Sequence, residues 1–316
     1  MYKIVSYNSS LLEDWNKLVS TSPNTSFLFY REFMEYHSDR FKDASLLVYK
    51  NDRLIAVFPA NIKNNTLYSH QGLTYGGFVV EQSLNATDVE PMINAFLDYL
   101  KTTNVQEFHL KGLPGFYHSD ISKAIETYIN TKATELYRTD KVLAIDYYQP
   151  IEIHKTKRKH FRRHQETGFK IEETQDFTMF WENILVPRLN EKHGVKPVHS
   201  LKEIMLLKKR FPQQIKQYNI LLNKTILAGI TIFDKGRIVK SQYGATTETG
   251  EQMRALEYLF ITLINKYKAE GKSFFSMGTV RDEEHPKGYN EGLLRQKQEL
   301  GCKEFHQHFY KLKISG

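Results

Sequence analysis

The clearest hydrophobic pattern in the chain runs from Ile226 to Lys313. It opens with an almost continuous apolar run over residues 226–233, a turn at 234–236 and a second apolar run over 238–243. After a polar loop at 244–250, apolar residues return at helical spacing until Gly271. This spacing predicts an amphipathic helix, followed by a strand at 273–277 and a short helix at 290–300. The order predicts an α/β (α+β mixed) fold, in which helical crossovers connect the strands of a mixed sheet.

Shorter patterns of the same kind fill the rest of the chain. We expect strands at 1–7, 44–49, 54–62, 66–70, 107–110, 137–147, 170–173 and 215–222. The first hairpin should turn at Asn51 and Asp52. Helices are predicted at 11–18, 27–37, 89–100, 119–129, 154–168 and 177–192, and from Ser200 to about 211. Asp176 is the expected cap of the helix at 177–192, and Glu203 lies at capping-box spacing from Ser200.

The two halves of the chain repeat one another. The apolar run at 54–57 matches 226–229, the glycine loop at 75–77 matches 243–245, and Gly112 and Gly278 each follow a predicted strand. Each half contains strand, two helices, hairpin, glycine loop, helix, strand, helix and strand in the same order. We therefore expect two tandem domains, at residues 1–150 and 151–316.

This doubled order resembles the GNAT acyltransferase fold as it occurs in tandem in the FemAB-like (peptidyltransferase-like) family. The basic stretch at 157–168, ended by Gly168, is similar to the arginine-rich helix that opens the second domain in that family. The stretch at 289–301, with Gly292, Leu293 and Lys297 before Gly301, is similar to the helix near the end of such domains. The resemblance covers the whole chain and implies an N-acyltransferase that passes an acyl or aminoacyl group from acyl-CoA or aminoacyl-tRNA to an amine.

Composition indicates the class of protein and the compartment in which we expect it. With 41% hydrophobic and 25% charged residues, the chain is globular. Its single cysteine, Cys302, excludes an internal disulfide and suits a reducing cytoplasm. Because the chain has neither a membrane-length apolar run nor a signal-like N-terminus, we expect a cytoplasmic protein without membrane insertion. The scattered histidines give no metal-ligand pattern, so no metal cofactor is predicted.

The net charge of +8 is concentrated in one place. Residues 154–165 hold six lysines and arginines and no acidic residue. Such a helix could neutralise phosphates of tRNA or another nucleic acid. The plainer interpretation is an exposed linker helix. A non-catalytic binding protein that uses this helix for an anionic partner is the alternative to the enzyme hypothesis.

Candidate active-site residues come from the second half. In the resemblance, strands 238–243 and 273–277 splay apart around the acyl donor, so Gln242 would contact substrate and Tyr243 could act as a general acid. His193 and His199 flank Lys196 in one loop, where a histidine could serve as general base and the lysine could hold an anion. The alternative interpretation is that His193 and His199 are surface histidines and that Tyr243 is a packed aromatic residue. Asn290 and Lys297 would line the donor side; their plainer roles are a helix cap and a solvated lysine.

The loop expected to cradle a donor pyrophosphate has unusual charges. Of its residues, Gly250 and Arg254 suit a phosphate, whereas Glu248 and Glu251 would repel it. Acyl-CoA therefore fits less well than an aminoacyl-tRNA donor, which the resemblance to FemAB-like proteins implies. The acceptor would be an amine-bearing small molecule or cell-envelope precursor.

A second ligand contact is predicted in the first half. Polar residues and glycines crowd the end of the strand at 66–70, among them His70, Tyr75 and Gly76. A sheet core would not favour such a run, so we expect these three residues to border a substrate.

Overall fold

The computed structural model describes residues 1–314, apart from the side chain of His193. It divides the chain into two compact units: one comprises Met1–Asp140 and the chain from His306 onward, and the other Lys141–Phe305. Strand β8 (Glu135–Asp146) leads from the first unit into the second, and β14 (Lys303–Lys313) leads back. The periodicity of the sequence did not anticipate that the last strand returns to the first unit.

The first unit contains short strands and four α-helices within its described residues. Its elements are β1 (Tyr2–Ser6), α1 (Leu12–Thr21), α2 (Arg31–Met34), β2 (Leu46–Lys50), β3 (Arg53–Phe58), β4 (Asn61–Lys63), β5 (Thr66–Tyr68), β6 (Val79–Val80), α3 (Ala86–Lys101), β7 (Glu107–Lys111) and α4 (Asp120–Lys132).

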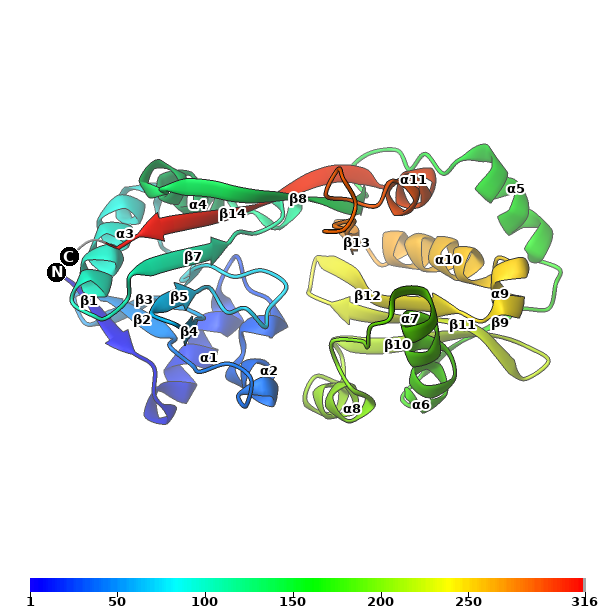
Figure 1. Cartoon of the computed structure of the whole chain (residues 1–316), viewed down its shortest axis with the longest axis horizontal. Coiled ribbons are helices and arrows are strands. Elements are labelled where there is room, and N and C mark those ends of the chain that lie inside the picture. Colours follow the sequence, from blue (N-terminus) through cyan, green and yellow to red (C-terminus); the bar gives the residue numbers. More distant parts are fainter. Residues whose placement is uncertain (315–316) are drawn as a thin grey trace. The chain divides into compact units, whose positions relative to one another are not determined.

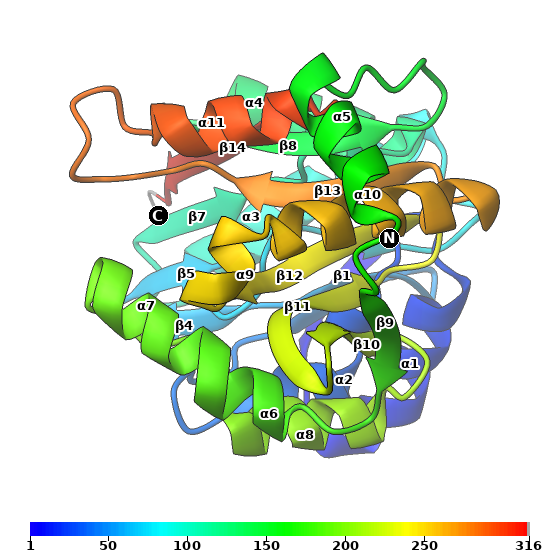
Figure 2. The same cartoon turned by 90° about the vertical axis from the view of Figure 1, so that its right-hand side faces the viewer.

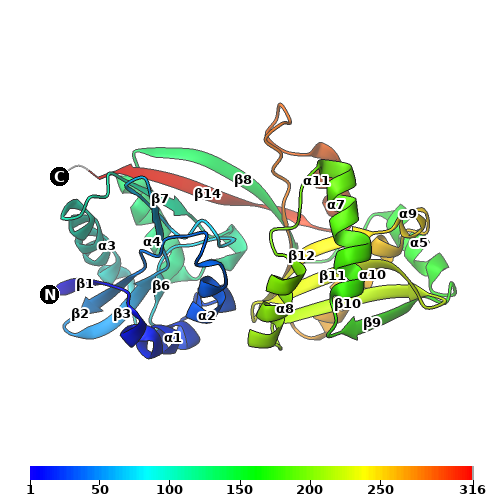
Figure 3. The same cartoon turned by 60° about the horizontal axis from the view of Figure 1, so that its bottom comes forward.

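Its strands form two groups, in the orders β1-β2-β3-β6 and β4-β5-β7-β14. Helices α3 and α4 lie on one side of the strands and α1 and α2 on the other (Figure 3). The core between the strands and α3 is aromatic: Phe58 lies 4.9 Å from Phe96 and 5.5 Å from Phe108 between ring centroids. Burial of such rings is the main favourable term in folding.

The second unit follows the same plan with longer strands. Its elements are α5 (Lys155–His164), β9 (Lys170–Thr174), α6 (Thr178–Phe180), α7 (Val186–His193), α8 (Leu201–Arg210), β10 (Ile215–Leu222), β11 (Thr225–Asp234), β12 (Ile238–Thr246), α9 (Glu248–Gln252), α10 (Ala255–Ala269), β13 (Phe274–Thr279) and α11 (Glu291–Glu299).

Its sheet runs β8-β13-β12-β11-β10-β9. Helix α10 covers one face, with α5 beside it, and α6, α7 and α8 cover the other (Figures 1 and 2). Strand β11 is therefore buried on both faces, which explains its unbroken apolar run. The pairings are antiparallel except for β5 with β7 and β12 with β13 among the described ladders. The mixed, mostly antiparallel α/β fold predicted from the sequence is confirmed.

Three predicted segments have a different local structure. The single helix expected at 27–37 is broken, because Tyr30 is extended (ψ 143°) between a 3-10 turn and α2. The helix expected at 177–192 contains a π-helical stretch, Trp181–Leu185, between α6 and α7. The loop expected at 244–250 is instead the end of β12 and the start of α9.

Within residues 1–314, no helix combines the length and apolar character needed to cross a bilayer.

Candidate functional site

Strand β12 leaves its neighbour β13 part-way along its length. The two strands pair in parallel only from Ile238 with Phe274 to Lys240 with Ser276. Beyond Lys240, β12 continues to Thr246 and pairs only with β11 among the described strands. The resemblance implied such a separation, and it leaves backbone groups along one edge of β12 without a sheet partner.

A β-bulge accompanies this separation. On β12, Tyr243 pairs with Thr231 and Ser241 with Ile232, so Gln242 is the extra residue. A bulge bends its strand and increases the local twist. Strand β13 has an irregularity of its own, between Ser276 and Gly278, in its pairing with β8. Both strands therefore depart from regular geometry near the point where they separate.

Tyr243 and His199 lie in contact at this bulge. The tyrosine hydroxyl is 2.6 Å from Nδ1 of His199 and accepts a hydrogen bond from the His199 backbone N–H at 3.1 Å. Trp181 holds the same loop, because its indole N–H donates to the His199 carbonyl at 3.1 Å. Burial raises the pKa of Tyr243 to about 12, so its phenol is protonated at neutral pH. In the tautomer that carries its proton on Nδ1, His199 donates to this oxygen, and the phenolic proton can be donated to a ligand.

The amide of Gln242 adds an unusual feature. Its Oε1 is buried and has no hydrogen-bond partner within the described part of the chain. An orphaned buried acceptor costs about 1–3 kcal/mol, and a ligand or water donor would recover that cost. Gln242 therefore offers an acceptor beside the Tyr243–His199 pair.

Lys196 and His193 are the other two site residues predicted in the histidine loop. Lys196 is exposed, and His193 ends α7 with its side chain outside the described part of the structure.

Lys297 lies on α11, and Asn290 is the residue immediately before this helix. The ammonium of Lys297 is buried and donates to the carbonyls of Met277 at 2.6 Å and Thr279 at 2.9 Å. Burial lowers the pKa of Lys297 to about 8. Asn290 caps α11, accepting from the N–H of Leu293 at 2.8 Å. Lys297 thus fixes the backbone where β13 ends, and Asn290 has the cap role that the sequence offered as its plainer reading.

The expected phosphate loop is a short helix, and its cap engages the amide of Gly250. Thr247 caps α9, and its Oγ1 accepts from the N–H of Gly250 at 3.0 Å. A Cβ on Gly250 would lie 2.3 Å from the carbonyl oxygen of Leu227, so this glycine is required by packing. Arg254 has a left-handed backbone (φ 54°) and lies 4.0 Å from Glu257. Two cations, Arg188 and Lys192, hold the carboxylate of Glu251.

The predicted ligand contacts of the first unit are largely buried. His70 is 3% exposed, has φ 54° and stacks on His37 at 5.2 Å. Burial lowers the pKa of His70 to about 3, so its ring is neutral. Tyr75 is 1% exposed and packs on Phe29. A Cβ on Gly76 would lie 2.1 Å from the carbonyl oxygen of Ser69, so close packing requires glycine there.

The basic helix α5 is anchored by one of its lysines. Lys157 is buried, donates to Glu257 at 2.6 Å and lies 3.4 Å from Glu299. The remaining five cations of the stretch are exposed: Lys155, Arg158, Lys159, Arg162 and Arg163.

Sequence reasoning missed Lys111, at the end of β7. Its ammonium donates to the carbonyls of Gln71 and Leu73, and burial lowers its pKa to about 8. Nothing in the local pattern distinguishes it from a surface lysine. No group of three or more histidine, cysteine or acidic side chains suited to a metal occurs in the part of the chain that the structure describes.

Solved structures match the whole chain, whereas no family model and no curated protein matches the sequence. FemX aligns over 97% of this chain and 96% of its own, with a TM-score of 0.67 and 11% identity. L-PGS from Bacillus licheniformis aligns over 96% and 91%, with a TM-score of 0.59 and 11% identity. The C-terminal domain of a putative lysylphosphatidylglycerol synthetase from Agrobacterium fabrum aligns over 98% and 93%, with a TM-score of 0.60 and 8% identity. The resemblance inferred from the sequence is confirmed at the level of the fold: this chain has the FemX-like, tandem GNAT fold.

Proposed function

We propose that this protein transfers an acyl or aminoacyl group from an activated donor to an amine, at the point where β12 separates from β13. The observation that carries the proposal is the contact of Tyr243 with His199 beside the orphaned Oε1 of Gln242, on a bulged strand with a free edge. A hydrogen-bond acceptor, a proton donor and unpaired backbone groups are the parts that acyl transfer needs.

In this mechanism the amine donates a hydrogen bond to Oε1 of Gln242, which orients its lone pair toward the donor carbonyl. Attack forms the new C–N bond, and N–H groups along the free edge of β12 stabilise the oxyanion. Collapse breaks the bond to the leaving oxygen. Tyr243 gives its proton to that oxygen, and the proton released by the amine returns to Tyr243 through His199.

We infer that the donor is an aminoacyl-tRNA, with acyl-CoA as the second candidate. The five exposed cations of α5 can neutralise several phosphates of a folded RNA. The amide of Gly250, which a pyrophosphate would need, is committed to the cap of α9. The acceptor is an amine-bearing small molecule or cell-envelope precursor; one of the similar structures is named as a domain of a putative lysylphosphatidylglycerol synthetase.

Filter binding of charged tRNA at several salt concentrations tests the donor. Replacing Arg158 and Lys159 on α5 by glutamate should weaken binding and reduce the slope of log K against log salt by about two, one for each lost phosphate contact. The matched control replaces Lys202 and Lys209, two exposed lysines of α8, and should bind as the native protein does. Equal losses in both double variants, or stabilisation by acetyl-CoA without any tRNA binding, would contradict this donor.

A further inference from the structure

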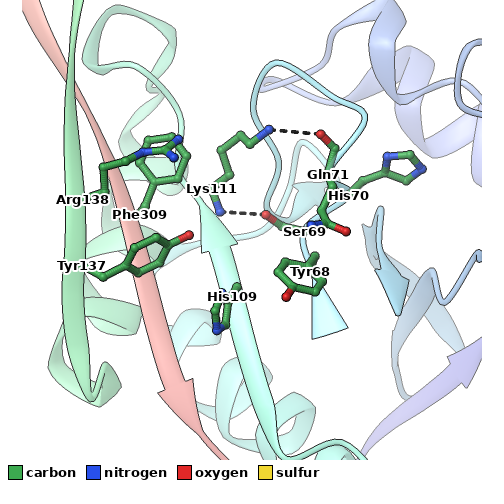
Figure 4. Close-up of a pocket in the computed structure, with 9 residues that line it drawn as sticks. All are labelled: Tyr68, Ser69, His70, Gln71, His109, Lys111, Tyr137, Arg138 and Phe309. Atoms are coloured by element: carbon green, nitrogen blue, oxygen red, sulfur yellow. Dashed lines mark hydrogen bonds between the residues drawn. The ribbon is translucent and has the colours of Figure 1, made fainter. Parts of the chain in front are cut away.

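The first unit contains a pocket of about 230 Å³ beside the point where β5 leaves β7 (Figure 4). The parallel pairing of these strands ends at Tyr68 with His109. After Tyr68 the chain turns away, and the backbone N–H of Lys111 donates instead to the hydroxyl of Ser69 at 2.8 Å. The separation resembles that of β12 and β13, so the internal repeat has placed comparable openings in both units.

Lys111 supplies the innermost cation of this pocket. Its ammonium has three hydrogens, and the carbonyls of Leu73 at 2.7 Å and Gln71 at 3.3 Å accept two of them. No carboxylate among the described residues forms an ion pair with this ammonium. One donor of Lys111 is therefore left for a ligand.

Arg138, on β8, supplies a second cation on the other side of Lys111 from Gln71 (Figure 4). Its guanidinium lies 3.4 Å from the centroid of Phe309, and this stacking fixes the plane of the group. Asp140 lies 3.1 Å from Nε of Arg138 as an ion pair, but this nitrogen has no hydrogen-bond partner within the described residues, so the guanidinium keeps a donor for a ligand. Burial is the main cause of the lowered pKa of Lys111, and the positive charge of Arg138 is the next. The two charges therefore act on one another.

Aromatic rings complete the walls. The ring of His109 lies 5.0 Å from that of Tyr68 and 5.5 Å from that of Tyr137. The side chain of His70 points away from the other lining residues (Figure 4). None of the residues that line the pocket is acidic. The lining thus combines two cations with flat apolar surfaces.

We propose that this pocket binds a small molecule through an oxyanion, a phosphate or a carboxylate, held between Lys111 and Arg138. Guanidinium and ammonium groups together favour an oxyanion, because each forms charge-assisted hydrogen bonds to it. The volume lies below the usual range of about 300–1,000 Å³ for drug-sized ligands, so the pocket takes a headgroup-sized fragment. This binding does not rest on the acyl transfer proposed above, and it is measured without turnover.

Titration calorimetry of the intact protein tests the proposal, with inorganic phosphate in one arm and acetate in the other. Ionic strength is held constant with chloride. We expect saturable binding in at least one arm, and the responding arm identifies the class of oxyanion. Arg138→Gln and Lys111→Met should each weaken that binding by about tenfold or more, because each removes a charge-assisted contact. Lys63→Gln, at an exposed lysine of the same unit, should leave it unchanged.

Arg138→Gln keeps the test decisive if Lys111→Met does not fold, since Arg138 lies partly exposed at the surface of its strand. It also separates this pocket from α5, which belongs to the second unit. Binding no stronger than that of chloride in both arms would overturn the proposal. Undiminished binding by folded Arg138→Gln would overturn it equally.

Discussion

The hydroxyl oxygen of Tyr243 lies 2.6 Å from Nδ1 of His199, although 44 residues separate the two in sequence. The same oxygen accepts from the His199 backbone, so one phenol holds both the ring and the main chain of the loop before α8. The two residues therefore form one unit that bridges the bulge of β12 and the histidine loop.

Tyr243→Phe should abolish most acyl transfer while costing about 1–3 kcal/mol of stability, because the hydroxyl makes two hydrogen bonds to the buried His199. The measurements are turnover of a charged donor and urea unfolding of the folded variant. His199→Asn is the matched variant, because its amide can retain the contact with Tyr243 but cannot relay a proton. Turnover at the native rate in both variants would contradict their proposed role while sparing the fold.

Gly250→Ala should destabilise the second unit by about 2 kcal/mol or more, because the added Cβ would lie 2.3 Å from the carbonyl oxygen of Leu227. Gly292→Ala is the control: its nearest contact is 3.4 Å away in exposed helix, so a gain of about 0.5–1 kcal/mol is expected. Chemical denaturation measures both. A Gly250→Ala protein of native stability would show that this glycine is not required by packing.

His70→Asn should flatten the loss of stability in acid. Burial lowers the pKa of His70 to about 3 from an ordinary value of 6.5, so below pH 6.5 the unfolded chain binds a proton that the native state excludes. The native protein therefore loses about 1.4 kcal/mol per pH unit from this group, or about 2 kcal/mol between pH 6.5 and 5. Asparagine tolerates the left-handed backbone and does not titrate.

Denaturant unfolding at pH 7, 6 and 5 compares native protein with His70→Asn, and with a His306→Asn control at an exposed position. Parallel pH profiles for native protein and His70→Asn would show that this ring does not carry the acid sensitivity.

Lys297→Met should remove a gain in stability that the native protein shows at alkaline pH. Burial lowers the pKa of Lys297 to about 8, so between pH 8 and 10.5 the native state has lost a proton that the unfolded chain retains. The stability of native protein relative to Lys297→Met should rise over this interval by about 3 kcal/mol, from 1.36 kcal/mol per pKa unit. Unfolding at pH 7.5 and 10 measures it, with exposed Lys303→Met as control; an unchanged difference would contradict the buried ammonium.

Features fixed by neighbouring residues could be predicted from the sequence. Asn51 and Asp52 form the expected hairpin turn with φ of 48° and 62°, and Ser200 and Glu203 form the expected capping box. The period of apolar residues also located most strands and the long helices, because one face of each packs on the core.

Features that depend on distant partners could not be predicted in this way. The bulge at Gln242 exists only in register with Thr231 and Ile232 on the adjacent strand. Lys111 is buried against the carbonyl of Leu73 and Lys297 against that of Met277 on β13, and a local pattern treats both lysines as surface residues. The ligand assignments of His193, Lys196, Gly250 and the other candidates remain predictions that only binding and kinetic data test.

Transfer itself is the most direct test of the central claim. Purified protein is mixed with tRNA carrying a radiolabelled amino acid and with a fraction of amine-bearing cell-envelope precursors, and the label in the precursors is followed under single-turnover conditions. A parallel reaction uses labelled acetyl-CoA in place of the charged tRNA. We predict label transfer from the aminoacyl-tRNA that depends on native protein and is lost in Tyr243→Phe. Salt-sensitive tRNA binding without transfer from either donor would contradict the enzyme and favour a non-catalytic binding protein.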